Sequence, residues 1–295
     1  MTDTVIANAQ IADARRVAFQ GEAGAFSNLA AREAVPQAAA VPTPTFEDAI
    51  AAVKSGDCDL GIIPVENSLH GRIADIHHLL PDAGLHIVGE HFQRIHHQLL
   101  GVKGARIEDL KNVYSQIPAL SQCRKVIKEL KLAVHNWHDT AGAARHVAER
   151  GEYANAAIAS ALAGEIYGLA VLRADVEDAE HNVTRFLILS RQAQTAPVGV
   201  PAITSFVFRV RNVPAALYKA MGGFASNGIN ITKLESYQLG GSFNATQFYA
   251  DIEGHVADDA VKRAFEELAF FTARLTVLGC YPAHPFRARM PYAQS

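Results

Sequence analysis

The residues best suited to chemistry stand in the segment 182–186, where Asn182, Thr184 and Arg185 precede the apolar run 187–189. A short continuous apolar run is typical of a strand that is buried on both faces of a sheet. An amide, a hydroxyl and a guanidinium at such a strand end can bind a small anion, since ligands of α/β proteins sit outside strand ends. The alternative is structural, with Asn182 capping a turn and Arg185 in an ion pair.

Two earlier segments also place polar groups beside a predicted strand. Residues 20–27 follow a short strand and open a helix, and free N–H groups at a helix N-terminus favour an anion. The apolar run 60–65 ends in Glu66, Asn67 and Ser68, which can all donate or accept hydrogen bonds. Glycines three apart also occur in ordinary turns, so a structural role for the first segment stays open.

A metal site is suggested by histidines but not supported by their spacing. Neighbouring histidines in a strand point to opposite faces, and the chain has no H-E-x-x-H helix. The three cysteines lie far apart without a C-x-x-C pair, so neither a zinc cluster nor a disulfide framework is expected. We therefore expect no metal. The histidines considered are His77, His78, His91, His96, His97, His135 and His138.

Composition indicates a globular chain of about two domains. The 295 residues are 49% hydrophobic and 19% charged, and the formal net charge is −3. Basic residues form no long block, which argues against a nucleic-acid surface. No apolar run reaches membrane-spanning length, and the cysteine usage fits a reducing compartment, so we expect a cytoplasmic protein without membrane contact.

The elements that position these residues alternate between strand and helix. Strands and helices take turns from residue 113 to residue 171, which predicts a parallel sheet with helices on both sides. The strand of Thr184 closes this region, so residues of the first and second halves can face each other across a cleft. The expected architecture is two α/β lobes around a cleft, like a periplasmic binding protein.

A second module follows an uncharged linker with two prolines and a glycine. Its predicted order of strand, helix, strand, strand, helix, strand gives a ferredoxin-like α+β fold, with the two middle strands joined at Gly240 and Gly241. We expect an N-terminal extension over residues 1–16, a two-lobed α/β domain over 17–192, a linker over 193–202, the second module over 203–282 and a tail over 283–295.

Taken together, the motifs resemble a known family. In chain order they are Gly21-Glu-Ala-Gly24-Ala-Phe-Ser27, Pro64-Val-Glu66-Asn67-Ser68-Leu-His-Gly71, Asp139-Thr140-Ala141 and Asn182-Val-Thr184-Arg185-Phe186. This combination resembles the catalytic domain of prephenate dehydratase, and the second module resembles the regulatory ACT domain of that family. The resemblance covers roughly residues 17–281.

The resemblance implies decarboxylative dehydration of prephenate to phenylpyruvate in phenylalanine biosynthesis. This reaction needs no cofactor, because the electrons released by decarboxylation leave with the hydroxyl group. Thr184 is expected to donate a hydrogen bond or proton to that hydroxyl. The implied catalytic residues are Thr184, Glu66, Asn67 and Ser68, and the implied substrate-binding residues are Ser27, Gly24, Gly71, Thr140, Arg185 and Phe186.

The resemblance also implies feedback regulation by L-phenylalanine bound to ACT modules in a homodimer or homotetramer. The implied effector residues are Ala215, Ala216, Leu217, Asn227, Leu234, Glu235 and Ser236. Three stretches depart from the family pattern. The usual Gly-Ala-Leu, Glu-Ser-Arg-Pro and Ser-His-Pro-Gln-Ala-Leu appear here at residues 215–217, 235–238 and 115–120 with substitutions.

Two rival functions share these features. An arogenate dehydratase would carry the same catalytic motifs, and turnover of the two substrates separates it from a prephenate dehydratase. A non-catalytic amino-acid sensor would also use two lobes around a cleft and an ACT-like module. A sensor would bind its ligand without forming phenylpyruvate.

Overall fold

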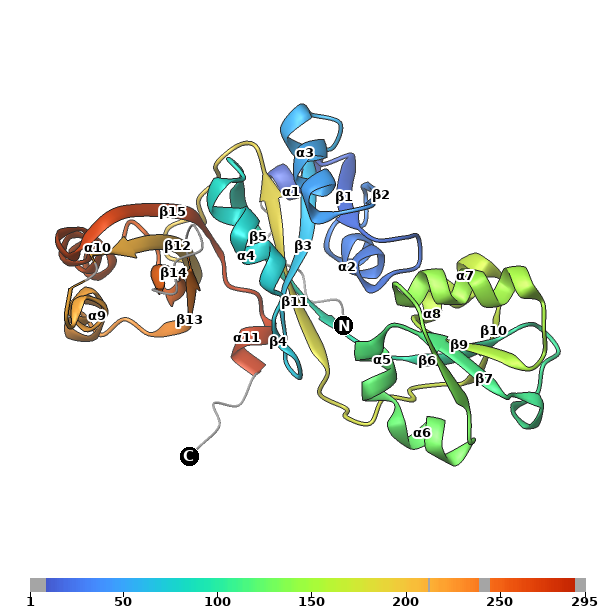
Figure 1. Ribbon diagram of the computed structural model, residues 1–295. Helices are drawn as coiled ribbons and strands as arrows, with labels where there is room; N and C mark the ends of the chain where they lie inside the picture. The colour runs from blue at the N-terminus through green and yellow to red at the C-terminus, as the bar shows by residue number, and fades with distance from the viewer. Residues whose placement is uncertain (1–8, 212, 239–244, 290–295) are drawn as a thin grey trace.

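The computed structural model describes residues 9–211, 213–238 and 245–289, and the structural statements below concern these residues. Three parts lie in a row: a C-terminal module, a first lobe and a second lobe (Figure 1). The expected two-lobed α/β architecture with a ferredoxin-like C-terminal module is confirmed. The glycine pair 240–241 lies outside the described residues.

The first lobe is built on a six-stranded sheet in the order β2-β1-β3-β11-β5, with β4 paired to β3. Its strands are β1 (Arg16–Gln20), β2 (Ala39–Thr43), β3 (Leu60–Asn67), β4 (Gly71–Arg72), β5 (His86–Arg94) and β11 (Val183–Ser190). Its helices are α1 (Ala9–Asp13), α2 (Phe26–Ala34), α3 (Phe46–Ser55), α4 (Ala74–Leu79) and a 3-10 turn, η1 (Leu80–Asp82).

The second lobe contains a five-stranded sheet in the order β10-β6-β9-β7-β8. Only the pairs β7·β8 and β7·β9 are parallel, so the sheet is mixed and not wholly parallel as expected. Its strands are β6 (Gln98–Gly101), β7 (Asn112–Ser115), β8 (Ala133–Asn136), β9 (Asn155–Ala159) and β10 (Ala170–Arg173). Its helices are η2 (Ile107–Asp109), α5 (Ile117–Gln122), α6 (Arg124–Glu129), α7 (Thr140–Arg150) and α8 (Ala161–Tyr167).

Two crossing segments join the lobes. One runs from β5 to β6 through residues 95–97, and the other returns from β10 to β11 through residues 174–182. Backbone hydrogen bonds tie the segments together: the Ile95 N–H donates to the Asn182 carbonyl at 2.9 Å, and the Val176 N–H donates to the His97 carbonyl at 2.8 Å. The strand of Thr184 therefore begins at the junction between the lobes.

Local sequence explains where several helices begin and end. Thr45 caps α3 by accepting a hydrogen bond from the Asp48 N–H, and Gly56 ends it with a left-handed φ of 93°, as the sequence predicts. The alternation of strands and helices between residues 113 and 171 predicts a single helix over about 118–130, but the structure has two, α5 and α6. Asp178 causes this break, because its carboxylate accepts hydrogen bonds from the N–H groups of Arg124 and Lys125 and so caps α6.

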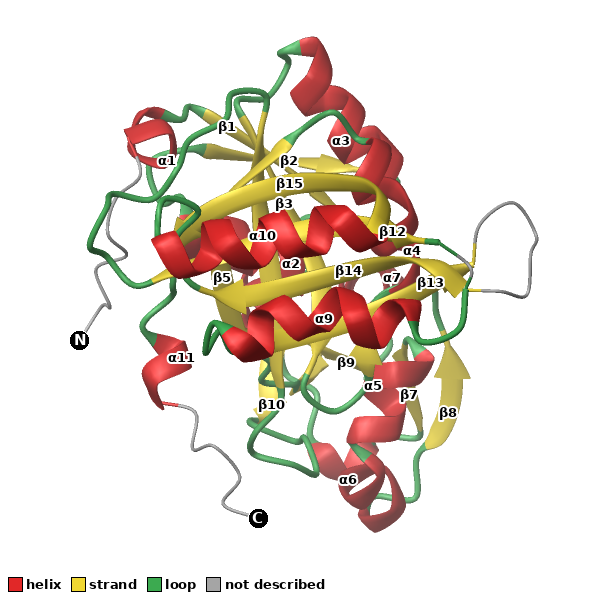
Figure 2. Cartoon of the chain, turned by 90° about the vertical axis from the view of Figure 1, so that its left-hand side faces the viewer, coloured by secondary structure: helices red, strands yellow, loops and turns green. Residues whose placement is uncertain are grey.

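The C-terminal module has an antiparallel sheet in the order β13-β14-β12-β15. Helices α9 and α10 cover one face of this sheet (Figure 2). Its elements are β12 (Ala202–Val210), α9 (Ala216–Ser226), β13 (Ile231–Gln238), β14 (Ala245–Glu253), α10 (Asp259–Phe271) and β15 (Thr272–Pro282), and a short helix α11 (Phe286–Arg289) follows.

The other face of this sheet packs on the first lobe. Ile203, Tyr249 and Leu278 of the module share one buried cluster with Ile63 and Leu187 of the first lobe. The approach is close at Gly279, where a Cβ would lie 2.1 Å from the Ile87 carbonyl oxygen. The module and the first lobe thus share a continuous apolar core.

Residues 9–16, expected to belong to a loosely held extension, include α1. The Ile11 side chain is 7% exposed and packs with the α2 side of the first lobe, because α1 presents an apolar residue to that core. None of the helices in the described part of the chain is long and apolar enough to cross a membrane.

Candidate active site at the ends of β3 and β11

The residues of the central motif are divided between the two faces of the first sheet. In the pairing of β11 with β3, Thr184 lies opposite Asn67 and Arg185 lies opposite Glu66. Successive side chains on a strand point to opposite faces. Thr184 and Asn67 therefore share one face, toward α2, while Arg185 and Glu66 share the other, toward the C-terminal module.

On the first face, Asn67 organises the polar group around Thr184. Its Nδ2 donates to the Thr184 Oγ1 at 3.0 Å and to the Asn182 Oδ1 at 2.8 Å. The Thr184 residue is 8% exposed. A hydroxyl has one proton to donate and two lone pairs. Because the Thr184 oxygen accepts from Asn67, its own proton stays available to a substrate.

Gln122 of the second lobe completes this group. Its Oε1 accepts from the Asn182 Nδ2 at 2.9 Å and lies 2.8 Å from the His97 Nε2, while its Nε2 lies 3.0 Å from the His70 Nδ1. These contacts connect α5 of the second lobe to the ends of β3 and β11. Sequence reasoning did not select Gln122 as a site residue, because a glutamine inside a helix carries no local signal of function.

His97 is a neutral, buried member of the same group. Burial lowers the pKa of His97, although the contact with Gln122 acts in the opposite direction. No described group pairs with its Nδ1 atom. The ring of Phe26, the first residue of α2, packs edge-on against His97 with 5.3 Å between the ring centroids. The sequence offered His97 only as a possible metal ligand.

The start of α2 faces the second lobe and has no side-chain cap. Ala25 precedes the helix and makes no capping hydrogen bond, so the first turn, which includes Ser27, has N–H groups available for an anion. Gly24 touches the second lobe: a Cβ on it would lie 2.7 Å from the Ala163 Cα, and its carbonyl accepts from the Ser160 Oγ at 2.5 Å.

Other expected site residues have clear positions. Thr140 is 3% exposed at the start of α7, which Asp139 caps. Phe186 is 1% exposed and packs in the first-lobe core. The Ser68 Oγ donates to the His181 carbonyl at 2.8 Å and accepts from the Val183 N–H. Gly71 begins β4 with a left-handed φ of 75°.

On the second face, Arg185 is the centre of a buried ion-pair network. Its Nε donates to the Glu90 Oε2 at 2.8 Å, and one terminal nitrogen donates to the Glu66 Oε1 at 2.9 Å and to the Asp251 Oδ2 at 2.6 Å. The other donates to the Tyr281 hydroxyl at 2.9 Å. The Arg185 side chain is only 3% exposed. This geometry corresponds to the ion pair considered as the structural alternative.

Two further cations balance the carboxylates of the network. Lys233 of β13 contacts the second Glu66 oxygen at 2.6 Å, and Arg287 of α11 makes a two-pronged contact with Glu90 at 2.6 and 2.8 Å. Three cations, Arg185, Lys233 and Arg287, thus face three carboxylates, Glu66, Glu90 and Asp251. We call these six residues the Arg185 network.

The pKa values follow from this arrangement. Burial alone would raise the pKa of Glu66, but the charges of Arg185 and Lys233 outweigh burial and lower it. The pKa values of Glu90 and Asp251 are lowered in the same way, mainly by Arg185. Burial disfavours the charged form of Arg185 and would lower its pKa. Asp251, Tyr281 and Glu90 outweigh burial and raise the Arg185 pKa well above the usual value. The three carboxylates and Arg185 are therefore charged at neutral pH.

A pocket of about 620 Å³ opens on the second face. Glu66, Arg94 and Arg185 contribute charge to its lining, and the rings of Phe92 and Phe286 stack at 4.9 Å to form an apolar wall. The remaining lining residues are Asn67, Ser68, His181, Val183, Thr232, Arg287 and Arg289.

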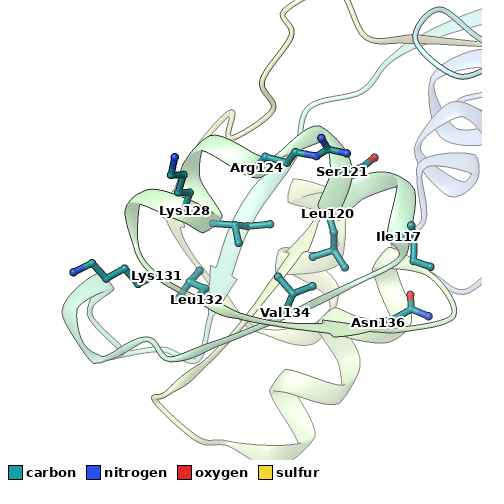
Figure 3. A pocket seen from close by; sticks show the side chains of 10 residues that line it. Ile117, Leu120, Ser121, Arg124, Lys128, Lys131, Leu132, Val134 and Asn136 are labelled. Carbon is teal, nitrogen blue, oxygen red and sulfur yellow. The ribbon is translucent and has the colours of Figure 1, made fainter.

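A second hollow lies away from all expected site residues. It has a volume of about 700 Å³ on the second lobe, between α5, α6 and β8 (Figure 3). Leu120, Leu132 and Val134 line its base, while Arg124 and Lys128 add positive charge. Of the family-pattern stretches, 115–120 contributes Ile117 and Leu120 to this surface, and the others contribute nothing among the described residues.

One group of described residues has the geometry to hold a metal ion. His96, Asp175 and Glu177 offer ligand atoms within 4.8 Å of one another at the junction between the lobes. The His96 Nδ1 lies 2.8 Å from the Glu177 Oε1, a distance that an ordinary charged hydrogen bond explains. The sequence-based expectation remains that the protein uses no metal.

The expected effector residues lie on two elements of the C-terminal module. Ala215, Ala216 and Leu217 stand at the start of α9, and Asn227 caps its end, about 16 Å away by helix geometry. The segment 234–236 lies on the edge strand β13. Ala215 has a left-handed φ of 61°, the conformation that the family's usual glycine adopts without strain.

A family model described as prephenate dehydratase matches residues 17–194. A protein of Komagataeibacter europaeus named bifunctional N-acyl-homoserine lactone acylase/prephenate dehydratase is 51% identical over 93% of this chain and 98% of its own length. Arogenate dehydratase 2 of Petunia hybrida is 40% identical over 91% of this chain and 72% of its own.

The fold agrees with that of a solved family member. The structure of prephenate dehydratase from Arthrobacter aurescens in complex with L-Phe has a TM-score of 0.83 to this chain. The two share 27% identity, and the match covers 91% of this chain and 90% of the other. The family match spans more than half of the 295 residues. The chain therefore belongs to the prephenate dehydratase family of hydro-lyases.

Proposed function

We propose that this protein converts prephenate to phenylpyruvate. The observation that carries this proposal is the Thr184–Asn67 pair at the junction between the lobes. Among the described residues of the central motif, Thr184 has the only hydroxyl, it lies on the face toward α2, and Asn67 fixes its orientation. A hydroxyl held in this way suits a leaving hydroxyl group better than it suits nucleophilic attack.

The reaction sets three demands on the site. The prephenate dianion takes up one proton and gives the phenylpyruvate anion, carbon dioxide and water. The bond from the ring to its carboxylate breaks, its electrons form the aromatic ring, and the bond to the ring hydroxyl breaks as that group leaves as water. The enzyme must therefore donate to the leaving oxygen, hold two carboxylates and exclude solvent.

The described residues supply the donor and a site for one of the two carboxylates. Thr184 donates to the leaving oxygen, and the uncapped start of α2 near Ser27 holds one carboxylate. Gln122, Asn67 and the neutral His97 provide polar groups from both lobes around the same place. A threonine hydroxyl is a weak acid, so water from solvent must restore its proton after each turnover.

Arogenate is the second candidate substrate. It carries an amino group where prephenate carries a keto group, and the Petunia relative is named as an arogenate dehydratase. The two substrates share the ring, the leaving hydroxyl and the departing carboxylate, so the Thr184 site serves both. The experiment is to compare kcat/KM for prephenate and for arogenate. A higher value for prephenate is expected, and a value higher for arogenate would reassign the substrate.

Amide hydrolysis is disfavoured at the same site. The Komagataeibacter relative is also named as an acylase. A hydroxyl nucleophile needs a neighbouring base to take its proton. The Thr184 hydroxyl accepts from the Asn67 amide, which is not a base, so this pair assists a leaving group and does not create a nucleophile.

We further propose that the C-terminal module is an ACT domain that binds L-phenylalanine in a homo-oligomer. The expected effector residues stand about 16 Å apart at the two ends of α9, so a second copy of the module is needed to bring both groups to one ligand. Calorimetry with phenylalanine tests this. Saturable binding with a change in KM is expected, and binding of no phenylalanine would contradict it.

A further inference from the structure

We propose that Arg185 is a positioning residue, which couples the C-terminal module to the Thr184–Asn67 pair, and that Lys233 and Asp251 are its partners from the module. The family resemblance implies a different role, in which Arg185 holds a substrate carboxylate. The new role deepens the proposed function, because it assigns a route by which the module acts on that same site.

The strand register provides the mechanical link. Arg185 and Glu66 are directly paired, and their side chains lie on one face of the sheet. The adjacent pair, Thr184 before Arg185 and Asn67 after Glu66, has its side chains on the other face. A shift of the backbone that moves one pair also moves the other. Since interfaces repack between discrete states, a small change at the module face can reach the hydroxyl of Thr184.

Four of the five N–H donors of Arg185 are used on the module face. Its three nitrogens contact Glu66, Glu90, Asp251 and Tyr281, and the last two belong to the module. Glu90 and Asp251 have fully buried side chains. A guanidinium that is 3% exposed and held by three carboxylates on the module face is not placed to bind a substrate on the opposite face.

Lys233 joins the expected effector segment to this network. Its Nζ contacts Glu66 at 2.6 Å and Glu235 at 3.4 Å, and Glu235 also pairs with Arg72 of β4 at 3.5 Å. Glu66 precedes Asn67 on β3. The chain of contacts therefore runs from residue 235 through Lys233 and Glu66 to the residue that orients Thr184.

The alternative is that the Arg185 network only fastens the module to the first lobe. A purely structural fastening would lower global stability, so exchange would speed up equally in all protected strands, and the balance between KM and kcat would not change. The Lys233→Met variant separates these readings, because it removes one charge at the edge of the network and keeps the aliphatic stem.

The first measurement is hydrogen exchange of the full-length protein, which does not depend on activity. In Lys233→Met, the amides of 60–67 and 183–190 are expected to exchange about tenfold faster, within the range of such couplings, while those of β9 in the second lobe change less. Lys262→Met is the matched control, since Lys262 pairs with Asp259 on α10, away from the first lobe. Unchanged exchange in β3 and β11, or equal acceleration there and in β9, would overturn the proposal.

The second measurement is turnover of prephenate by the same variants. Lys233→Met is expected to change KM for prephenate by about tenfold relative to Lys262→Met, and Lys233→Arg is expected to restore it. If Lys233→Met does not fold, Asp251→Asn serves as the second variant, because it removes a charge with little change of shape. An unchanged KM would contradict the coupling. Absence of turnover in the wild type would contradict the proposed function alone, since the exchange result stands independently.

Discussion

At the residue scale, the site depends on side chains that belong to different lobes. Thr184 and Asn67 come from the first lobe, and Gln122 reaches them from the second through Asn182. Neutral amides and a hydroxyl predominate on this face, while the charged groups lie on the opposite face. The face that could hold substrate is thus preorganised by hydrogen bonds and not by ion pairs.

Replacing Gln122 tests this contribution of the second lobe. Gln122→Leu keeps the size of the side chain but leaves the buried Asn182 amide without its partner, which costs about 1–3 kcal/mol of stability. We expect a higher KM for prephenate together with this loss. Ser121→Ala is the control, because its hydroxyl bonds only to the Pro118 carbonyl on the exposed side of α5. Equal KM values for the two variants would exclude Gln122 from the site.

The sequence predicted which residues lie close together, but not which residues contact each face of the sheet. The motifs around Thr184 and Asn67 predict their proximity, and the structure pairs them on adjacent strands. Strand alternation alone shows that Thr184 and Arg185 face opposite ways. No local pattern shows which residues Arg185 and Glu66 will contact. Their partners Asp251 and Lys233 belong to a module that lies more than forty residues further along the chain.

At the element scale, the lobes meet through close backbone contact between the turn before α2 and α8. Gly24 has a left-handed φ of 91°, and its missing Cβ leaves room for Ala163. The same helix start supplies the uncapped N–H groups near Ser27. One short segment therefore sets both the interlobe distance and a candidate carboxylate site.

A methyl group at this position should push the lobes apart. Gly24→Ala combines backbone strain of about 1–2 kcal/mol with a clash against Ala163. We expect lower stability, a larger radius of gyration by X-ray scattering and at least tenfold lower kcat/KM, since small displacements of catalytic groups have effects of about this size or larger.

Gly56→Ala is the matched control for Gly24→Ala. Gly56 has a similar φ of 93°, but a Cβ there would meet only the Arg191 side chain at 3.6 Å. It should therefore show the strain without the change in scattering or turnover. If Gly24→Ala behaved like Gly56→Ala, the contact between the turn and α8 would have no role in closing the lobes.

Element boundaries were predictable where a capping residue lies next to the helix and not where the cap comes from afar. Thr45 and Gly56 mark both ends of α3 within the segment itself. The break between α5 and α6 depends on Asp178, more than fifty residues away along the chain. Tertiary capping of this kind leaves no local signature in the sequence.

At the scale of the whole molecule, the C-terminal module and the first lobe share an apolar core and the Arg185 network. The carboxylates of this network have lowered pKa values in the folded protein. Their contribution to stability is therefore complete above their ordinary values of 4.5 and 3.8. This contribution decreases as the pH falls below the ordinary pKa values, and it is lost once the pH has fallen through the lower pKa values of the folded protein.

Glu90→Gln tests the network through this pH dependence. Loss of one buried carboxylate leaves Arg185 and Arg287 partly uncompensated, and we expect about 3–5 kcal/mol lower stability at neutral pH. Urea unfolding of the variant should also depend less on pH below about 4.5 than that of the wild type. Glu129→Gln, which removes an exposed pair with Arg173, should cost at most about 1 kcal/mol. Equal stability losses would contradict a special role for Glu90.

The most direct test is to measure carbon dioxide and phenylpyruvate formed from prephenate by the wild type, Thr184→Ser and Thr184→Val. We predict equal amounts of the two products from the wild type, retained activity in Thr184→Ser, and a kcat about 10²- to 10⁴-fold lower in a folded Thr184→Val. Formation of neither product by the wild type, or turnover by Thr184→Val at the wild-type rate, would contradict the account.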